Sequence, residues 1–267
     1  MNGYERVRAA VEGRRPDRVP AMLEMDTAVM AGALGVPVAF PAEEPARTVR
    51  LLVERFHGQV YVRGNCDQLA LSLATMARGA AEFYMDLCYE EKEVLVHELL
   101  EYCTGAALQY IRLMAQTGCD MVSNGDSPAG PDLISPEMYE RFALPYEKRV
   151  ADEAHRLGLP YALHICGDTT RILDAMVRTG TDCLELDYKT DTAAAHAALK
   201  DRVTLIGNID PSGVLRWGDV NKVEAETRAL CRAFADTPRF ILNAGIPQGT
   251  PSDNIRALVR VAREFGG

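Results

Sequence analysis

The sequence has 267 residues, of which 48% are hydrophobic, with a net charge of −9 and no block of lysine or arginine. This length and apolar content allow a large buried core, and α/β barrels of about 200–250 residues commonly form one domain. The acidic balance argues against a nucleic-acid groove or an anionic membrane surface as the partner. We therefore expect a single domain over residues 1–267 that binds neither nucleic acid nor membranes.

The amino-terminal residues, Met1 to Val7, are typical of a helix start and lack the pattern of a signal peptide. No apolar run reaches the roughly 18 residues that a membrane span requires. The seven cysteines are an odd number and form no Cys-x-x-Cys pair, which is typical of reduced thiols. These features together predict a cytoplasmic protein.

Helical and strand-like segments alternate along the whole chain. Strands are expected at residues 19–26, 59–65, 120–126, 160–166, 182–187, 203–209 and 239–243. Helices are expected at residues 4–12, 46–56, 69–78, 81–87, 91–116, 135–157 (in one or two pieces), 171–179, 192–200, 222–235 and 250–265. Such alternation predicts an α/β protein with a parallel sheet.

The positions of the polar residues favour a barrel over an open sheet. No strand is followed by a glycine-rich nucleotide-binding motif, which weakens the doubly wound alternative. Polar residues instead follow the expected strands, where a TIM-type barrel builds its active site: Glu24/Asp26, Asn65/Asp67, Asn124/Asp126, His164/Cys166, Glu185/Asp187, Asn208/Asp210 and Asn243. Only seven strands are expected, so one βα unit is missing, irregular or hidden near residues 20–45.

The strand at residues 160–166 ends in His164-Ile165-Cys166. Side chains alternate between the two faces of a strand, so His164 and Cys166 point the same way with Cα atoms about 6–7 Å apart. An imidazole nitrogen and a thiolate sulfur at that spacing can both reach one zinc ion, at about 2.0–2.1 and 2.3 Å. A hydrogen-bonded pair without metal is the alternative.

Several motifs in a fixed order give the chain a family resemblance. They are Gly-Arg-Arg-Pro-Asp-Arg-Val-Pro at 13–20, His-Ile-Cys-Gly-Asp at 164–168, Gly-Asn-Ile-Asp-Pro at 207–211 and Thr-Pro-Ser-Asp-Asn at 250–254. With these motifs the chain resembles the uroporphyrinogen decarboxylase superfamily, and within it the corrinoid-linked methyltransferase branch. The resemblance covers most of the chain and implies a TIM-type barrel.

The two branches imply different reactions. The decarboxylase proper carries arginines after its first strand that hold the carboxylates of a tetrapyrrole, whereas this chain has Glu24 and Asp26 there. The methyltransferase branch implies zinc, held by His164, Cys166 and a distant cysteine, and a methylcobalamin carried by a corrinoid partner protein. At the position of that distant cysteine the chain has Ala244. We therefore expect corrinoid-dependent methyl transfer, and tetrapyrrole decarboxylation is the alternative.

The sequence leaves four candidates for the third zinc ligand, each at an expected strand end: Glu24, Asp26, Cys66 and Asp126. We favour Glu24 or Asp26, because an oxygen ligand leaves a harder zinc that suits an ether or hydroxyl oxygen better than a thiol. Such a zinc favours removal of a methyl group from a small substrate onto the corrinoid, and transfer out of methylcobalamin is kept as the other direction.

The remaining polar strand ends supply further candidates. Asn208, Asp210 and Asp126 are candidate catalytic residues, although Asp210 precedes Pro211 and an alternative is that it starts a turn. Candidate substrate-binding residues are Asn65, Asp67, Asn124 and Asp187, and Asp187 is also a candidate to orient His164. The alternative without catalysis is a degenerate barrel that binds a small ligand, and a shortened barrel could close with help from a second copy in a homodimer.

Overall fold

The computed structural model describes residues 1–24, 46–56 and 58–265, so the predicted ligand Asp26 lies outside the described residues. The described residues form seven strands: β1 (Ala21–Glu24), β2 (Arg63–Gln68), β3 (Met121–Gly125), β4 (Tyr161–Ile165), β5 (Cys183–Leu186), β6 (Thr204–Asn208) and β7 (Phe240–Gly245). The helices are α1 (Gly3–Val11), α3 (Arg47–Phe56), α4 (Ala70–Arg78), α5 (Ala80–Asp86), α6 (Glu93–Ala115), α7 (Pro136–Phe142), α8 (Leu144–Arg156), α9 (Leu173–Arg178), α10 (Thr192–Leu199), α11 (Val220–Ala233) and α12 (Ser252–Glu264). Short helical turns precede α6 (Glu90–Lys92) and follow β3 (η2, Ser127–Ala129), β4 (η3, Thr170–Ile172) and β6 (η4, Pro211–Arg216).

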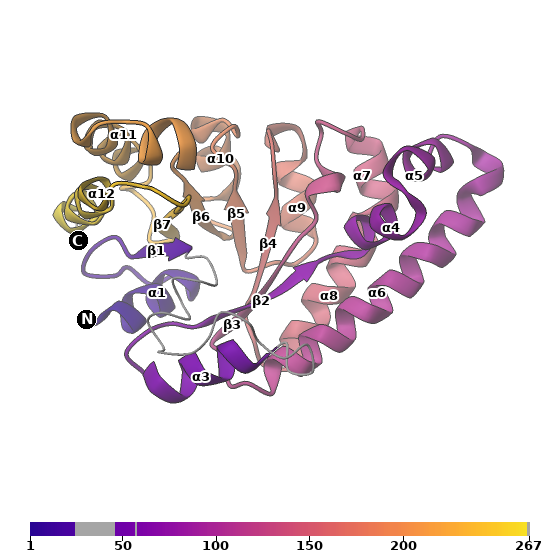
Figure 1. Ribbon diagram of the computed structural model, residues 1–267, viewed down its shortest axis with the longest axis horizontal. Helices are drawn as coiled ribbons and strands as arrows, with labels where there is room; N and C mark the ends of the chain where they lie inside the picture. The colour runs from indigo at the N-terminus through magenta and orange to yellow at the C-terminus, as the bar shows by residue number, and fades with distance from the viewer. Residues whose placement is uncertain (25–45, 57, 266–267) are drawn as a thin grey trace.

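The strands form one curled parallel sheet in the order β1-β7-β6-β5-β4-β3-β2, with helices on its outer face (Figure 1). Each neighbouring pair is parallel, so all carboxyl ends meet at the same rim. This confirms the predicted TIM-type barrel fold, with seven strands among the residues that the structure describes. In the described part of the chain β1 and β2 are the end strands of the sheet, and residues 25–45 lie between them in sequence, where the eighth βα unit was expected to be missing or hidden.

The interior of the barrel is built in two layers. Near the amino ends of the strands, Met121, Ala162, Cys183, Ile206 and Ile241 pack with Val7, Ala10 and Val11 of α1 in one buried apolar cluster. Because side chains alternate along a strand, the residue two positions later faces the same way. Those next residues are Ser123, His164, Glu185, Asn208 and Asn243. The interior is therefore apolar near the amino ends of the strands and polar at the carboxyl-terminal rim.

The opposite face of each strand packs against the helices. Leu163, Ile165, Leu184, Leu205 and Leu242 belong to a second, much larger cluster that the outer helices cover. This packing holds the strands in register and fixes the depth of the polar layer. No helix in the described ranges is both long and apolar enough to cross a membrane.

Candidate metal and substrate site

His164 and Cys166 meet at the rim, as the sequence predicts. His164 Nε2 lies 3.1 Å from Cys166 Sγ. The side chain of Ser127, in η2 after β3, donates a hydrogen bond from Oγ to the same sulfur at 2.9 Å. His164 is half-buried and Cys166 is exposed. The pair is thus open to solvent while its imidazole is held in the barrel.

The Glu185 carbonyl on β5 fixes the orientation of His164. His164 Nδ1 lies 2.9 Å from this oxygen. A carbonyl can only accept, so Nδ1 carries the proton and Nε2 is directed at the sulfur. The expectation that Asp187 orients His164 is wrong, because the Asp187 carboxylate accepts the backbone N–H groups of Gly167 and Lys189 instead.

The two side chains alter each other's pKa. Burial alone would lower the pKa of His164, but the hydrogen bond to Cys166 and the negative charge of Glu185 outweigh it and raise the pKa to about 9. The hydrogen bond with His164 lowers the pKa of the Cys166 thiol, and the Ser127 hydroxyl acts in the same direction. The thiolate is the form of cysteine that binds metals.

The pair fits half of a zinc site. Zn–N and Zn–S bonds at a tetrahedral angle place nitrogen and sulfur about 3.5 Å apart, close to the 3.1 Å between His164 Nε2 and Cys166 Sγ. The described residues contain no group of three potential metal ligands. Cys66 is buried, and burial raises the pKa of its thiol to about 12, which disfavours it as a ligand. Glu24 ends β1 beside Gly245 of β7, and its side chain lies outside what the structure describes.

Below the pair lies a buried network across the barrel. Glu185 Oε2 accepts from Arg63 Nη1 at 2.5 Å, and Glu185 Oε1 accepts from Asn243 Nδ2 at 2.5 Å. The side chains of Arg63 and Glu185 are only 12% and 11% exposed. Asn243 is buried and its Oδ1 has no hydrogen-bond partner within the described structure. The network joins β2, β5 and β7.

Two cavities open beside His164 and Glu185. One, of about 200 Å³, is also lined by the predicted residues Asp187 and Asn208, together with Asn243 and Ala244. The other, of about 160 Å³, is lined by the predicted residues Asn65, Asp67 and Asn124, together with Arg63 and Ser127. Asn124 has a structural role as well, because its Nδ2 donates to the carbonyls of Cys66 and Asp67 at the end of β2.

The other two predicted catalytic residues lie elsewhere. Asp210 Oδ1 accepts the backbone N–H groups of Ser212 and Gly213, so this carboxylate caps η4. Asp126 is fully buried on the helix side of β3, where its Oδ1 accepts from the backbone and hydroxyl of Ser72 and its Oδ2 has no partner among the described residues. Neither of them lines the two cavities beside His164.

We expect Asp126 to make the stability of the protein depend on pH. Burial raises its pKa from 3.8 to about 6, against the hydrogen bonds from Ser72 that lower it. The folded state therefore binds this proton more tightly than the unfolded state, and stability falls as pH rises from about 4 to 6. Between pH 4 and 7 the free energy of unfolding should decrease by about 2 kcal/mol more in the wild type than in Asp126→Asn. Urea unfolding across this pH range measures the difference. If the free energy of unfolding varied with pH in the same way in both proteins, the prediction would be contradicted.

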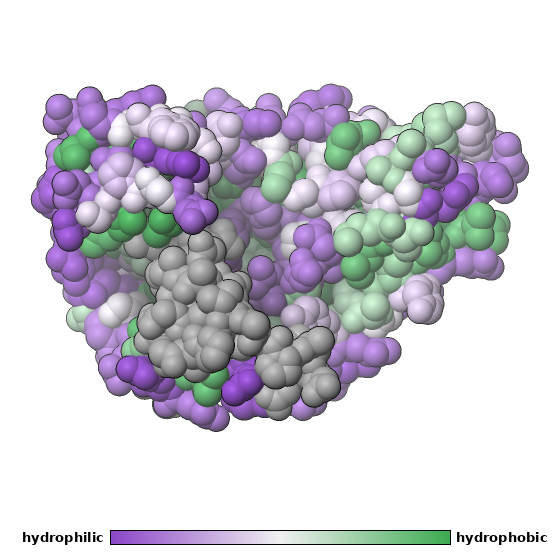
Figure 2. All heavy atoms as spheres, in the orientation of Figure 1, coloured by the Kyte–Doolittle hydropathy of each residue, from purple (hydrophilic) through white to green (hydrophobic). Residues whose placement is uncertain are grey.

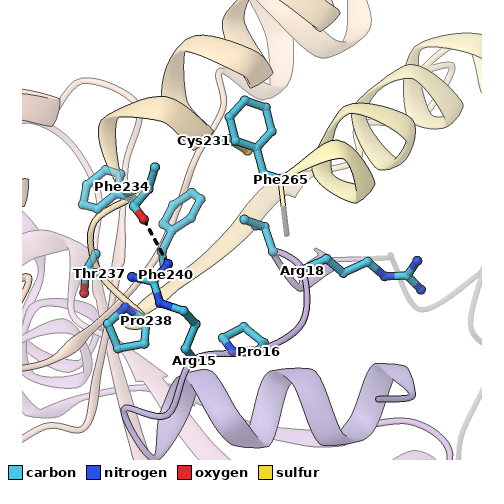
Figure 3. Close-up of a pocket in the computed structure, with 11 residues that line it drawn as sticks. Arg15, Pro16, Arg18, Cys231, Phe234, Thr237, Pro238, Phe240 and Phe265 are labelled. Carbon is cyan, nitrogen blue, oxygen red and sulfur yellow. Dashed lines mark hydrogen bonds between the residues drawn. The ribbon is translucent and has the colours of Figure 1, made fainter. Parts of the chain in front are cut away.

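A further cavity lies at the opposite end of the barrel (Figure 3). It measures only about 80 Å³ and is walled by Phe234, Phe240 and Phe265, with Arg15 Nη1 donating to the Ala235 carbonyl beside it. Phe240 begins β7, so this cavity is at the amino ends of the strands. In barrel enzymes that end serves stability, which leaves the rim around His164 as the candidate site.

Most of the chain is matched by a family of known proteins. Residues 34–265 match the family uroporphyrinogen decarboxylase (URO-D). The chain belongs to the uroporphyrinogen decarboxylase family. The sequence resemblance to this family is thereby confirmed.

Relatives of this family carry two different names. A methylcobamide:CoM methyltransferase, MtbA, from Methanosarcina mazei is 31% identical over 219 residues, covering 82% of this chain and 62% of the relative. A uroporphyrinogen decarboxylase from Synechococcus sp. is 35% identical over 178 residues, covering 65% of this chain and 49% of the relative. The chain thus spans half to three fifths of the length of these relatives. A solved methyltransferase from Methanosarcina mazei superposes with a TM-score of 0.85 at 20% identity, covers 99% of both chains and shows the same fold.

Four residues of the site, Arg63, Ser127, Glu185 and Asn243, have no role in the sequence prediction. Arg63 precedes Asn65 by two positions on one strand, and strand alternation places both on the same face. The signal that could have identified Arg63 as a site residue was a charged side chain inside an expected strand. Glu185 and Asn243 stand out in the sequence only as polar strand ends. No local pattern marks Ser127 as a partner of Cys166.

Proposed function

We propose that this protein transfers a methyl group between a small substrate and a cobalamin carried by a corrinoid partner protein, with zinc at the barrel rim. One observation carries the proposal: His164 Nε2 and Cys166 Sγ lie 3.1 Å apart at the rim, with the imidazole fixed by the Glu185 carbonyl. The family membership and the relatives named methylcobamide:CoM methyltransferases support the same reaction.

His164 and Cys166 would hold the zinc, with Glu24 or Asp26 as the third ligand. Bound there, zinc would act as a Lewis acid that lowers the pKa of a thiol or polarises an ether oxygen. Ser127 keeps the sulfur oriented through its hydroxyl. Glu185 keeps the imidazole in the tautomer that leaves Nε2 for the metal. Asp187 and Asn208 line the cavity in which the substrate would lie.

Tetrapyrrole decarboxylation has less support. A substrate with many carboxylates needs several cationic side chains around it. Among the described residues that line the two cavities, Arg63 is the one arginine, and it is paired with Glu185. The rim instead presents the carboxylates of Asp67 and Asp187.

The surface beside the rim supports docking of a corrinoid protein. Helix α4 follows β2 directly, and α4 to α6 present exposed apolar side chains. Figure 2 shows this flank as a broad hydrophobic area on the right of the molecule. Met76 is 73% exposed, Val94 71%, and Met85 and Leu95 each 52%. Large exposed apolar patches of this kind commonly mark protein interfaces.

The reaction is tested in both directions with purified, zinc-loaded protein and a corrinoid protein. In one direction methylcobalamin is offered with a thiol acceptor, and in the other cob(I)alamin is offered with methoxylated or methylated substrates. The absorption spectrum of the corrinoid reports methyl transfer. We expect transfer in at least one direction. Absence of transfer in both directions would favour the alternative of a ligand-binding barrel without turnover.

The third zinc ligand gives a second prediction. Wild-type protein purified without chelators should contain about one zinc per chain, and either Glu24→Gln or Asp26→Asn should lower that content at least about tenfold. Ala244 lines the same cavity as His164, so Ala244→Cys should add a sulfur ligand and tighten zinc binding. Metal analysis against a competing chelator measures this. Unchanged zinc affinity in all three variants would rule out these ligand assignments.

A further inference from the structure

We propose that the corrinoid partner protein binds the face formed by α4, α5 and the first half of α6 through an apolar ridge that is bordered by lysine and arginine side chains. This inference rests on the proposed methyl transfer and deepens it, since it states the surface chemistry of the partner. Three observations support it: a groove in this face, the exposed apolar side chains around the groove, and the carboxylates beside them.

An apolar groove of about 250 Å³ lies between the three helices. Phe83 of α5 and Val96 of α6 line it and are buried, whereas Leu95 lines it and is 52% exposed. The two charged residues that line it, Arg78 and Asp86, pair with each other at 2.8 Å and so neutralise each other. The groove can therefore take an apolar side chain or a helix edge without burying an unpaired charge.

Five apolar side chains on the same helices are at least half exposed: Met76, Met85, Val94, Leu95 and Tyr102. Val94, Glu98 and Tyr102 follow at intervals of four residues in α6, so they share one side of that helix. Tyr102 is the most exposed of them, at 79%. Methionine side chains adapt to the shape of a partner and aromatic side chains anchor it, so this face has the composition of a protein interface.

The charges of the face favour a basic partner. Residues 79–102 contain seven Asp and Glu residues but one lysine and no arginine. Three of these carboxylates pair with arginines: Asp86, Glu93 and Glu101. Glu82, Glu91 and Glu98 are exposed and have no ion pair in the part of the chain that the structure describes. Lysine and arginine at the border of a partner would complement these carboxylates.

The same charges disfavour a second copy of this chain as the occupant. In a symmetric dimer the face would meet itself, and the carboxylates of one copy would lie against those of the other. Like charges brought together across an interface cost free energy and exclude that pairing. A different protein with a basic border is therefore the occupant that fits.

The face also adjoins the mouth of the barrel. Helix α4 begins at Ala70, just beyond the end of β2 at Gln68. Gln68, Asn65 and Asp67 line the cavity beside His164. In Figure 1, α5 and the start of α6 project beyond the sheet on this side. A protein bound here lies next to the rim, where its cobalamin would have to meet the substrate.

The probe that tests this inference is a corrinoid protein of the source organism, purified by its cobalamin absorbance and methylated. We expect Val94→Ser and Glu98→Lys each to raise the KM for this protein, and its Kd measured by calorimetry, at least about fivefold. Turnover of free methylcobalamin with 2-mercaptoethanol should stay within about twofold of the wild type, because free cobalamin does not need the face. Raising NaCl from about 50 to 500 mM should weaken wild-type binding several-fold and that of Glu98→Lys less.

Two matched controls lie away from the face. Val60 is 50% exposed and precedes β2 at the amino end of the barrel, and Glu54 is exposed in α3. Val60→Ser and Glu54→Lys should bind the corrinoid protein as the wild type does. A general loss of folding would instead lower the turnover of free methylcobalamin as well.

Unchanged affinity for the corrinoid protein in Val94→Ser and Glu98→Lys would overturn the inference, and turnover of free methylcobalamin would leave the methyl transfer standing. A dimer in sedimentation velocity that Val94→Ser dissociates would also overturn it, because a second copy would then be the occupant. If the wild type does not turn over free methylcobalamin, methyl transfer out of methylcobalamin fails, and the calorimetric affinities alone decide the inference.

Discussion

His164→Ala and Cys166→Ala are each expected to remove zinc and to reduce methyl transfer at least about 1,000-fold. Each substitution deletes one half of a pair whose atoms lie 3.1 Å apart. Lewis-acid activation is worth several kcal/mol, and each 1.36 kcal/mol is a factor of ten in rate. Zinc content and corrinoid absorbance measure the two effects.

Matched controls separate these effects from general damage. His155 is an exposed histidine paired with Asp182, and Cys88 is an exposed cysteine. His155→Ala and Cys88→Ala should retain zinc and turnover within about twofold. If the His164 and Cys166 variants also kept both, the zinc site would have to lie elsewhere.

Arg63→Met is expected to destabilise the fold by about 3 kcal/mol or more, the largest single stability effect that we predict. It leaves the Glu185 carboxylate buried in the barrel without its cationic partner. Breaking a buried ion pair on one side typically costs about 3–5 kcal/mol. Removing both charges in Arg63→Met/Glu185→Gln should restore more than half of that loss.

Urea unfolding of the single and double variants measures the coupling free energy between Arg63 and Glu185. Arg149 and Glu101 form an ion pair that is exposed on both sides, so Arg149→Met should cost less than about 1 kcal/mol. A similarly small effect of Arg63→Met would show that Glu185 does not depend on Arg63 in the folded barrel.

The strands and helices could be predicted because the chain repeats one simple unit. All seven expected strands are found, within a few residues of their expected bounds. The period-2 apolar pattern and the polar residue at each strand end are local signals, and they are strong in a parallel barrel. His164 and Cys166 were predictable for the same reason, since their spacing alone places them on one face.

The wider site could not be predicted from strand ends alone, because the end of a strand does not tell which face a side chain takes. Ser123 faces the barrel, whereas Asp126 lies on the helix side and is buried against Ser72. Asp210 lies beyond β6, and its carboxylate caps η4 by accepting the backbone N–H of Ser212. The contacts of Glu185 with Arg63 and Asn243 join three strands through the sheet register, which no local pattern encodes.

The central claim, that His164 and Cys166 form half of a zinc site completed by oxygen, is tested most directly by zinc X-ray absorption of the wild-type protein. We expect one sulfur at about 2.3 Å, and nitrogen and oxygen neighbours at about 2.0–2.2 Å. The sulfur signal should disappear in Cys166→Ala. A zinc surrounded by nitrogen and oxygen alone, or protein that stays free of zinc when the metal is supplied, would contradict the account.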